Sequence, residues 1–149
     1  MVLAAVDSPL YRLLFLGHMI SFVVAFAPAV INPVVTAQAK ADGPEVLARV
    51  SGYMARNGRV IHVPALVALG GFGLGMVFEG DWGFDHTWVS LAFLVWLAMC
   101  GVVTAVILPA ERLVARGLLE AERKVALGGQ TVAVLILVML YLMIWKPGA

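Results

Sequence analysis

The chain has 149 residues, of which 62% are hydrophobic and 13% charged, and its mean hydropathy is +0.99. Soluble domains are about 45–50% apolar and about 25% charged, so this composition excludes a water-soluble monomer. The formal net charge of +1 leaves no basic excess for a phosphate backbone, which argues against nucleic acid as a partner. The single cysteine, Cys100, can form neither an intrachain disulfide nor a zinc site built from cysteine pairs.

Four apolar runs are long enough to cross a bilayer, whose core of about 30 Å needs about 20 mostly apolar residues per helix. They cover residues 11–35, 60–78, 87–109 and 125–145. Ser8 and Pro9 are a typical N-cap and first helical residue for the first run. That run is too long and lacks the basic start of a signal peptide, although Ala37-Gln38-Ala39 resembles a cleavage site. The sequence therefore predicts an all-α fold, a four-helix transmembrane bundle in which residues 1–149 form one integral membrane domain.

Positive charge is distributed unevenly among the connecting segments. The segment at residues 79–86 has no Lys or Arg. Only Arg12 and Lys146 lie outside the first and third connecting segments. Residues 36–59 and 110–124 carry the other eight, which are Lys40, Arg49, Arg56, Arg59, Arg112, Arg116, Arg123 and Lys124. The positive-inside rule then places both termini outside a bacterial cytoplasmic membrane. An aromatic belt is expected at the outer surface, made of Tyr11, Trp82, Trp88, Tyr141 and Trp145.

Two connecting segments carry helical patterns. After Asp42, apolar residues recur at three and four spacing from Val46 to Met54, which predicts a short amphipathic helix lying on the membrane surface. The third span is expected to continue past a kink at Pro109 and to stop near Gly117. Charged residues in this continuation are typical of a solvated anchor attracted to anionic lipid.

The predicted spans contain no Asp, Glu or Lys, which argues against an ion-coupled transporter. His18, Ser21 and Asn32 share one stripe of the first helix, so this stripe is expected to face other helices. Asn32 is a candidate partner for carbonyls freed by Pro28 and Pro33. Small residues on the second helix predict close helix packing, with Gly71 and Gly75 as a G-x-x-x-G pair; the full set is Gly70, Gly71, Gly73 and Gly75.

His18 is the sharpest candidate for a functional side chain, because an imidazole within a span is costly unless it is hydrogen-bonded or bound to a metal. One hypothesis is a structural hydrogen bond, and the other is an axial ligand of haem b. His62 lies too far along the membrane normal to share one iron with His18, so Met76 or His86 would supply any second ligand.

A metal site for copper or another divalent ion is a further candidate near the outer surface. Imidazole, thioether and carboxylate groups suit such an ion, although solvated acidic residues explain the same pattern. The candidate set is His18, Met19, Met76, Glu79, Asp81, Asp85 and His86.

The chain resembles a family of small bacterial integral membrane proteins of unknown function. The resemblance rests on Gly17 with His18, residues 64–75, Trp88, residues 108–112 and residues 141–148, and it covers essentially the whole chain. A looser similarity links it to HemJ-type protoporphyrinogen oxidases and to the membrane domain of copper-resistance D proteins. In the HemJ-type enzymes, haem binding is associated with the first-helix histidine and a third-span lysine. His18 matches that histidine but the third span here has no lysine, which argues against the oxidase reaction and leaves haem or copper binding open.

Two functions from different classes follow from the sequence. In the first, the protein is a non-catalytic membrane subunit or scaffold, in contact with the bilayer and with other subunits or further copies of itself, because no catalytic set of residues is evident. In the second, it is a haem b- or copper-binding membrane redox or porphyrin-handling protein that uses His18.

Overall fold

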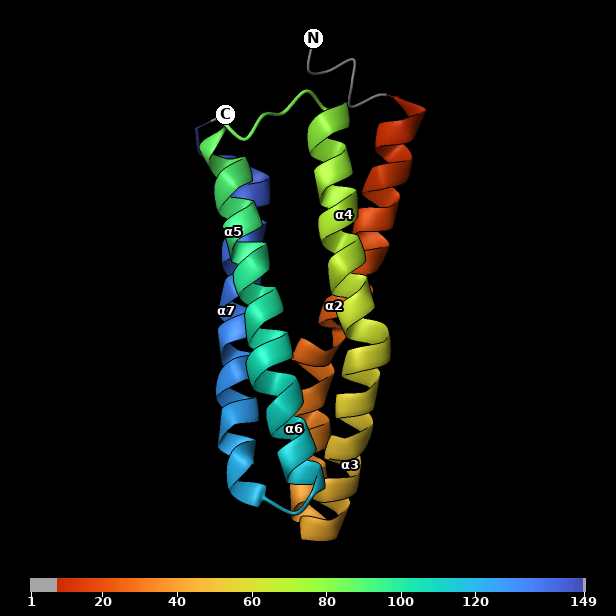
Figure 1. Cartoon of the computed structure of the whole chain (residues 1–149), viewed down its shortest axis with the longest axis vertical. Coiled ribbons are helices and arrows are strands. Elements are labelled where there is room, and N and C mark those ends of the chain that lie inside the picture. Colours follow the sequence, from red (N-terminus) through yellow and green to blue (C-terminus); the bar gives the residue numbers. More distant parts are fainter. Residues whose placement is uncertain (1–7, 149) are drawn as a thin grey trace.

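The computed structural model describes residues 8–148, and this part of the chain is helical with no strand (Figure 1). The predicted all-α class is confirmed. The elements in chain order are α2 (Pro9–Ala41), α3 (Pro44–Asn57), the π-helical segment η1 (Gly58–His62), α4 (Val63–Glu79), α5 (Thr87–Gly101), the π-helical segment η2 (Val102–Ile107), α6 (Leu108–Ala115), the short 3-10 turn η3 (Leu119–Ala121) and α7 (Glu122–Trp145).

These elements join into four long rods that are long and apolar enough to cross a membrane: Pro9–Ala41, Pro44–Glu79, Thr87–Ala115 and Leu119–Trp145. The chain is therefore a multi-pass membrane protein. The second rod has 36 residues, which at 1.5 Å per residue makes it about 54 Å long. Rods of this length extend well beyond a hydrocarbon core of about 30 Å.

The predicted surface helix after Asp42 forms, but in a different place. α3 runs directly through η1 into α4, and Figure 1 shows α3 standing along the bundle rather than across it. Its apolar side packs inward, with Leu47, Ser51 and Ala55 buried. The apolar face of α3 is therefore buried against α2 and α6. An amphipathic pattern fits this position as well as a membrane surface, because both bury one apolar face.

The predicted helix boundaries at Ser8 and Gly117 are confirmed. The Ser8 side chain accepts a hydrogen bond of 3.0 Å from the Tyr11 amide, and α2 begins at Pro9. The third rod continues to Ala115, and Gly117 follows with φ of +89°, a conformation that favours glycine.

Each π-helical segment ends just before a proline. Pro64 follows η1 and Pro109 follows η2, and the residue before each proline donates its amide five residues back, from Val63 to Gly58 and from Leu108 to Val103. A proline cannot donate to the carbonyl four residues earlier, and its ring crowds that carbonyl. Widening the preceding turn makes room for the ring, so both rods pass a proline without ending.

The second and third rods meet at one end of the molecule and separate at the other. A Cβ on Gly58 would lie within 2.4 Å of Leu108 Cδ2, so this glycine permits a close crossing. Beyond it α3 packs against α6, whereas α4 and α5 diverge towards the opposite end (Figure 1). We call the two ends of the bundle the α3–α6 end and the α4–α5 end. The beginning of α2 and the end of α7 lie at the α4–α5 end.

Candidate ligand-binding cavity

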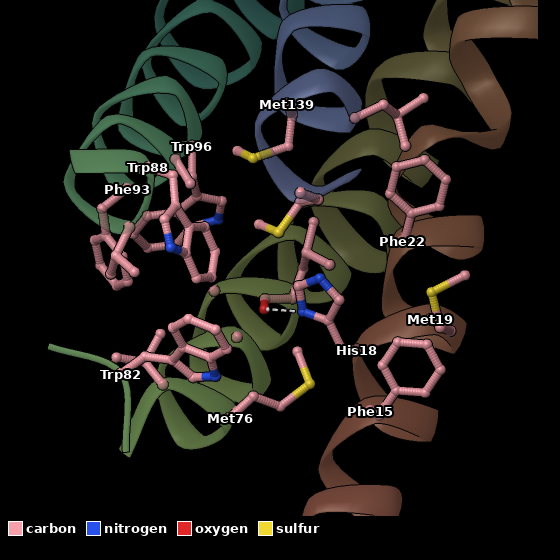
Figure 2. Close-up of a pocket in the computed structure, with 18 of the residues that line it drawn as sticks. Phe15, His18, Met19, Phe22, Met76, Trp82, Trp88, Phe93, Trp96 and Met139 are labelled. Carbon is pink, nitrogen blue, oxygen red and sulfur yellow. Dashed lines mark hydrogen bonds between the residues drawn. The ribbon is translucent and has the colours of Figure 1, made fainter. Parts of the chain in front are cut away.

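A cavity of about 270 Å³ occupies the space between the diverging rods at the α4–α5 end. Its walls come from all four rods: α2 and α4 on one side, α5 and α7 on the other. Figure 2 shows Trp82, Trp88, Phe93 and Trp96 gathered across the cavity from Phe15, Met19 and Phe22. The lining is almost entirely apolar and aromatic, which is typical of a site for a hydrophobic small molecule.

His18 lies in the wall of this cavity with one ring nitrogen fixed. Its Nδ1 lies 3.0 Å from the carbonyl oxygen of Leu69 (dashed line in Figure 2). A carbonyl only accepts, so Nδ1 carries the proton and donates it. In the neutral ring Nε2 then keeps its lone pair, and among the described residues Nε2 has no hydrogen-bond partner.

Gly73 makes room for the imidazole. A Cβ at this position would lie 3.2 Å from His18 Cε1, which is tighter than ordinary contact. The ring therefore packs on α4, where the Leu69 carbonyl accepts from Nδ1 and Gly73 leaves room beside Nδ1 and Cε1. A histidine fixed in this way through one ring nitrogen can offer the other to a ligand.

Trp96 closes the cavity towards the α3–α6 end. Its indole lies on Gly70, where a Cβ would be 2.3 Å from the ring, and its Nε1 donates to the Leu66 carbonyl at 2.9 Å. Phe93 packs edge-on against the same ring with centroids 5.4 Å apart. Trp96 thus bridges α5 to α4.

Trp82, Trp88 and Lys146 form the opposite rim. The two indole rings meet edge-on, with centroids 5.3 Å apart, and the Lys146 ammonium lies 4.5 Å from the Trp82 centroid. Trp88 is only 6% exposed, so its prediction as a membrane-belt residue is wrong, whereas Tyr141 and Trp145 are exposed as a belt requires. The buried Trp88 Nε1 has no hydrogen-bond partner among the described residues. An unpaired buried donor is costly, and a ligand with an acceptor atom would satisfy it.

Five of the seven methionines line this one cavity: Met19, Met76, Met99, Met139 and Met143. Methionine is flexible and polarisable, so walls made of it adapt to the shape of a bound molecule. Thioethers are also soft ligands that suit Cu(I).

The structure does not assemble the predicted metal set. Among residues 8–148, no three side chains of His, Cys, Asp or Glu gather closely enough to hold an ion. Glu79 instead accepts a 2.7 Å hydrogen bond from Ser8, and His86 is the N-cap of α5 with its ring edge-on to Trp82. Asp81 and Asp85 are exposed in the α4–α5 loop, while His18 and Met76 line the cavity.

His62 has a structural partner at a different level of the bundle. Pro28 has no amide hydrogen to donate to Val24, and His62 Nδ1 lies 2.7 Å from the Val24 carbonyl oxygen. The freed carbonyl is therefore satisfied by His62 rather than by Asn32. Asn32 is half-buried and Ser21 is buried, as the polar stripe predicted.

The glycines of α4 serve different neighbours. Gly70 faces Trp96, Gly73 faces His18, and Gly75 faces Leu14, where a Cβ would lie 3.0 Å from the side chain. Gly71 meets nothing within 4 Å. The predicted Gly71 and Gly75 pair is therefore split, with Gly75 used inside the chain and Gly71 open on the surface.

The sequence interpretation missed the aromatic wall. Trp88, Ala92, Trp96 and Met99 recur every three or four residues and so share one face of α5, a signal that was available in the spacing. Comparison of the chain with family models, with curated proteins and with solved structures found no match.

Proposed function

We propose that this protein binds a lipid-soluble ring compound carrying a hydroxyl group, in the chemical class of the quinols. The observation that carries the proposal is the His18 imidazole, whose Nδ1 is fixed by Leu69 while Nε2 retains its lone pair in an apolar cavity. Nε2 would accept a hydrogen bond from the hydroxyl. The aromatic side chains would stack against the ring, and the methionines would adapt to its substituents.

The rim of the cavity supports a second polar contact. Trp88 Nε1 is a buried donor without a partner among the described residues, so it would donate to a carbonyl or ether oxygen of the ligand. Lys146 also lines the cavity, where its ammonium lies over both indoles and favours an oxygen-rich group nearby. An apolar tail would leave between the diverging rods into lipid.

Cavity size supports this ligand class over haem b and copper. The donor set fits haem in chemistry, and bound haem would supply one-electron transfer. Cavities for drug-sized molecules span roughly 300–1,000 Å³ and a porphyrin is larger than most drugs, so a volume of 270 Å³ favours a single small ring system over the macrocycle. A single copper ion would leave most of this volume empty, although His18 and five methionines offer suitable ligands.

The test compares two histidines that each donate to a backbone carbonyl. The purified parent, His18→Leu and His62→Leu would be titrated with a short-chain naphthoquinol while tryptophan fluorescence is followed, because Trp82, Trp88 and Trp96 line the cavity. His18→Leu should bind about tenfold more weakly, as expected for loss of one hydrogen bond. His62→Leu should bind like the parent, since His62 lies outside the cavity.

Three results would contradict the proposal. The naphthoquinol could fail to quench the parent, or both histidine variants could lose binding equally. A Soret band or stoichiometric copper in the purified parent, absent from His18→Gln, would instead assign the site to haem or copper. The glutamine variant keeps a donor for the Leu69 carbonyl, which protects the fold while removing the imidazole.

A subunit or scaffold function is a second candidate, supported by Gly71. It lies on the exposed side of α4 with open space around it, so a helix of another subunit or of a second copy could approach there. Gly71→Leu should release the protein from a mild-detergent complex with its melting temperature unchanged. Gly75→Leu is the contrasting variant, since it clashes with Leu14 inside the chain and should lower stability instead. A parent that runs as a monomer contradicts this function.

We further propose that the α3–α6 end lies on the cytoplasmic side of a bacterial inner membrane, because it carries eight of the ten cations. Single cysteines at the exposed positions Asp85 and Glu120, in a Cys100→Ala background, would test this in intact cells. A membrane-impermeant thiol reagent should label Asp85→Cys and leave Glu120→Cys unlabelled. The reverse pattern would invert the orientation.

A further inference from the structure

A groove of about 510 Å³ lies at the α3–α6 end, on the side of α3 that faces α6. Four arginines line it together with small and apolar residues; the arginines are Arg56, Arg59, Arg112 and Arg116. We infer that this arginine groove binds a phosphate group, carried by an anionic phospholipid of the surrounding membrane. The inference does not depend on the ligand of the cavity.

The sequence spacing and the crossing of the rods build the groove together. Arg56 and Arg59 are three residues apart, and Arg112 and Arg116 are four apart, so each pair occupies one helix face. Gly52 and Ala115 lie next to each other where the rods meet, since a Cβ at Gly52 would be 3.6 Å from the Ala115 Cβ, an ordinary contact distance. Two pairs that are more than 50 residues apart in the chain therefore face the same space.

The charge in this groove is uncompensated within the described chain. No acidic residue lines it, and none of its four arginines forms an ion pair with another residue of the range 8–148. The nearby carboxylate of Glu111 is only 3% exposed and does not line the groove. Like charges on adjacent faces repel, so a bound anion would stabilise this arrangement.

Arginine specifies the chemistry of that anion. The planar guanidinium presents paired N–H donors that match two oxygens of a phosphate, which a lysine cannot do. The two lysines at the α3–α6 end of the bundle, Lys40 and Lys124, do not line the groove. A tetrahedral oxyanion with several acceptor oxygens therefore fits the groove better than a simple halide.

The border of the groove indicates a lipid as the source of the phosphate. Val60 lines the groove with 66% of its surface exposed, and the adjacent Ile61 is 47% exposed. In a multi-pass membrane protein, such exposed apolar residues face acyl chains. A phospholipid would thus place its phosphate among the arginines and its chains along Val60, and basic pockets between transmembrane helices bind anionic headgroups in this way.

Native mass spectrometry of the full chain in mild detergent tests the inference. We expect one phosphatidylglycerol to remain bound at concentrations at which phosphatidylcholine dissociates. The double variant Arg56→Gln with Arg112→Gln should weaken phosphatidylglycerol binding about 30-fold, given the usual strength of an arginine near an anionic headgroup. Replacing the same two residues by lysine retains the charge and should give an intermediate loss, because the paired N–H geometry is removed.

The matched control is Arg49→Gln with Arg123→Gln, which removes the same charge from exposed positions outside the groove. It should change phosphatidylglycerol binding less than about threefold, since those charges act only at long range through screening salt. An equal loss in both double variants, or equal retention of the two lipids, would overturn the inference. Inorganic phosphate that raises the melting temperature of the parent but not of the groove variant would keep the phosphate site and overturn its lipid source.

Discussion

The two ends of the bundle use the same four rods in opposite ways. At the α3–α6 end the rods pack around aliphatic side chains, with Ala39, Leu47, Val114 and Ala121 forming a buried cluster. At the α4–α5 end large aromatic residues line a cavity between the rods. Dense packing is the norm in protein interiors, so a volume lined by large aromatic side chains is what led to the proposal of a ligand there.

Glycines at the two ends of the bundle accommodate different kinds of side chain. Gly58 allows Leu108 to approach from a neighbouring rod and so closes the crossing. Gly70 and Gly73 instead accommodate Trp96 and His18, the side chains that line the cavity. The same residue type therefore closes one end and shapes the opening at the other, and the partner side chain decides which.

The largest expected difference in stability comes from introducing a leucine at each end of the bundle. Gly58→Leu places a side chain where Leu108 already lies, and overpacking of this kind costs about 1–3 kcal/mol. Ala92→Leu projects into the cavity, so its stability should stay within about 1 kcal/mol of the parent while naphthoquinol binding is lost. Unfolding of both variants would be followed in denaturing detergent.

Gly101→Leu is the control for this pair, because Gly101 is also helical and meets nothing within 4 Å. It should gain up to about 1 kcal/mol from helix propensity alone. Should Ala92→Leu prove as destabilising as Gly58→Leu, the cavity would be too small to accept even one side chain, and the contrast between the ends would fail.

A smaller effect, a coupling of about 1 kcal/mol between two positions, is expected between the two ends, where His62 contacts Val24. His62→Leu leaves the Val24 carbonyl without a partner, which costs about 1–3 kcal/mol. Pro28→Ala restores the amide that this carbonyl lacks, so His62→Leu should cost about 1 kcal/mol less in that background. A double-mutant cycle measures this coupling, and additive effects would show that His62 does not replace the missing backbone donor.

The smallest effect belongs to the ion pair between Lys40 and Glu122, which joins α2 to α7 at the α3–α6 end. The Lys40 side chain is 57% exposed, so solvent screens the pair. Lys40→Met should cost less than about 1 kcal/mol, and the difference from the parent should disappear in 1 M salt. A larger, salt-independent loss would mean that packing of the lysine stem, rather than charge, contributes to this end.

Much of the fold could be predicted from the sequence, because helix formation in a membrane depends on local composition. Apolar length defined four spans, the Ser8 cap defined the start of α2, and Gly117 defined the end of the third rod. The prediction failed where two environments produce the same pattern. An amphipathic helix suits a membrane surface as well as a bundle interior, and α3 lies in the bundle.

The candidate site was predictable only in part, because it depends on contacts between residues that are distant in the sequence. His18 is conspicuous in the sequence because a titratable ring within an apolar span is rare. Its orientation was not predictable, since Leu69 and Gly73 lie more than 50 residues away and only the packing of α4 on α2 brings them to the ring.

By itself, the sequence determined how many apolar helices form and which residues are polar within them, because these properties depend on neighbours along the chain. Only the tertiary structure decided that Trp88 faces a cavity instead of lipid, and that two distant arginine pairs share one groove. Both outcomes depend on how the second and third rods pack, close together at Gly58 and Leu108 and apart at α4 and α5. This packing results from side-chain contacts between distant segments, which local sequence patterns do not contain.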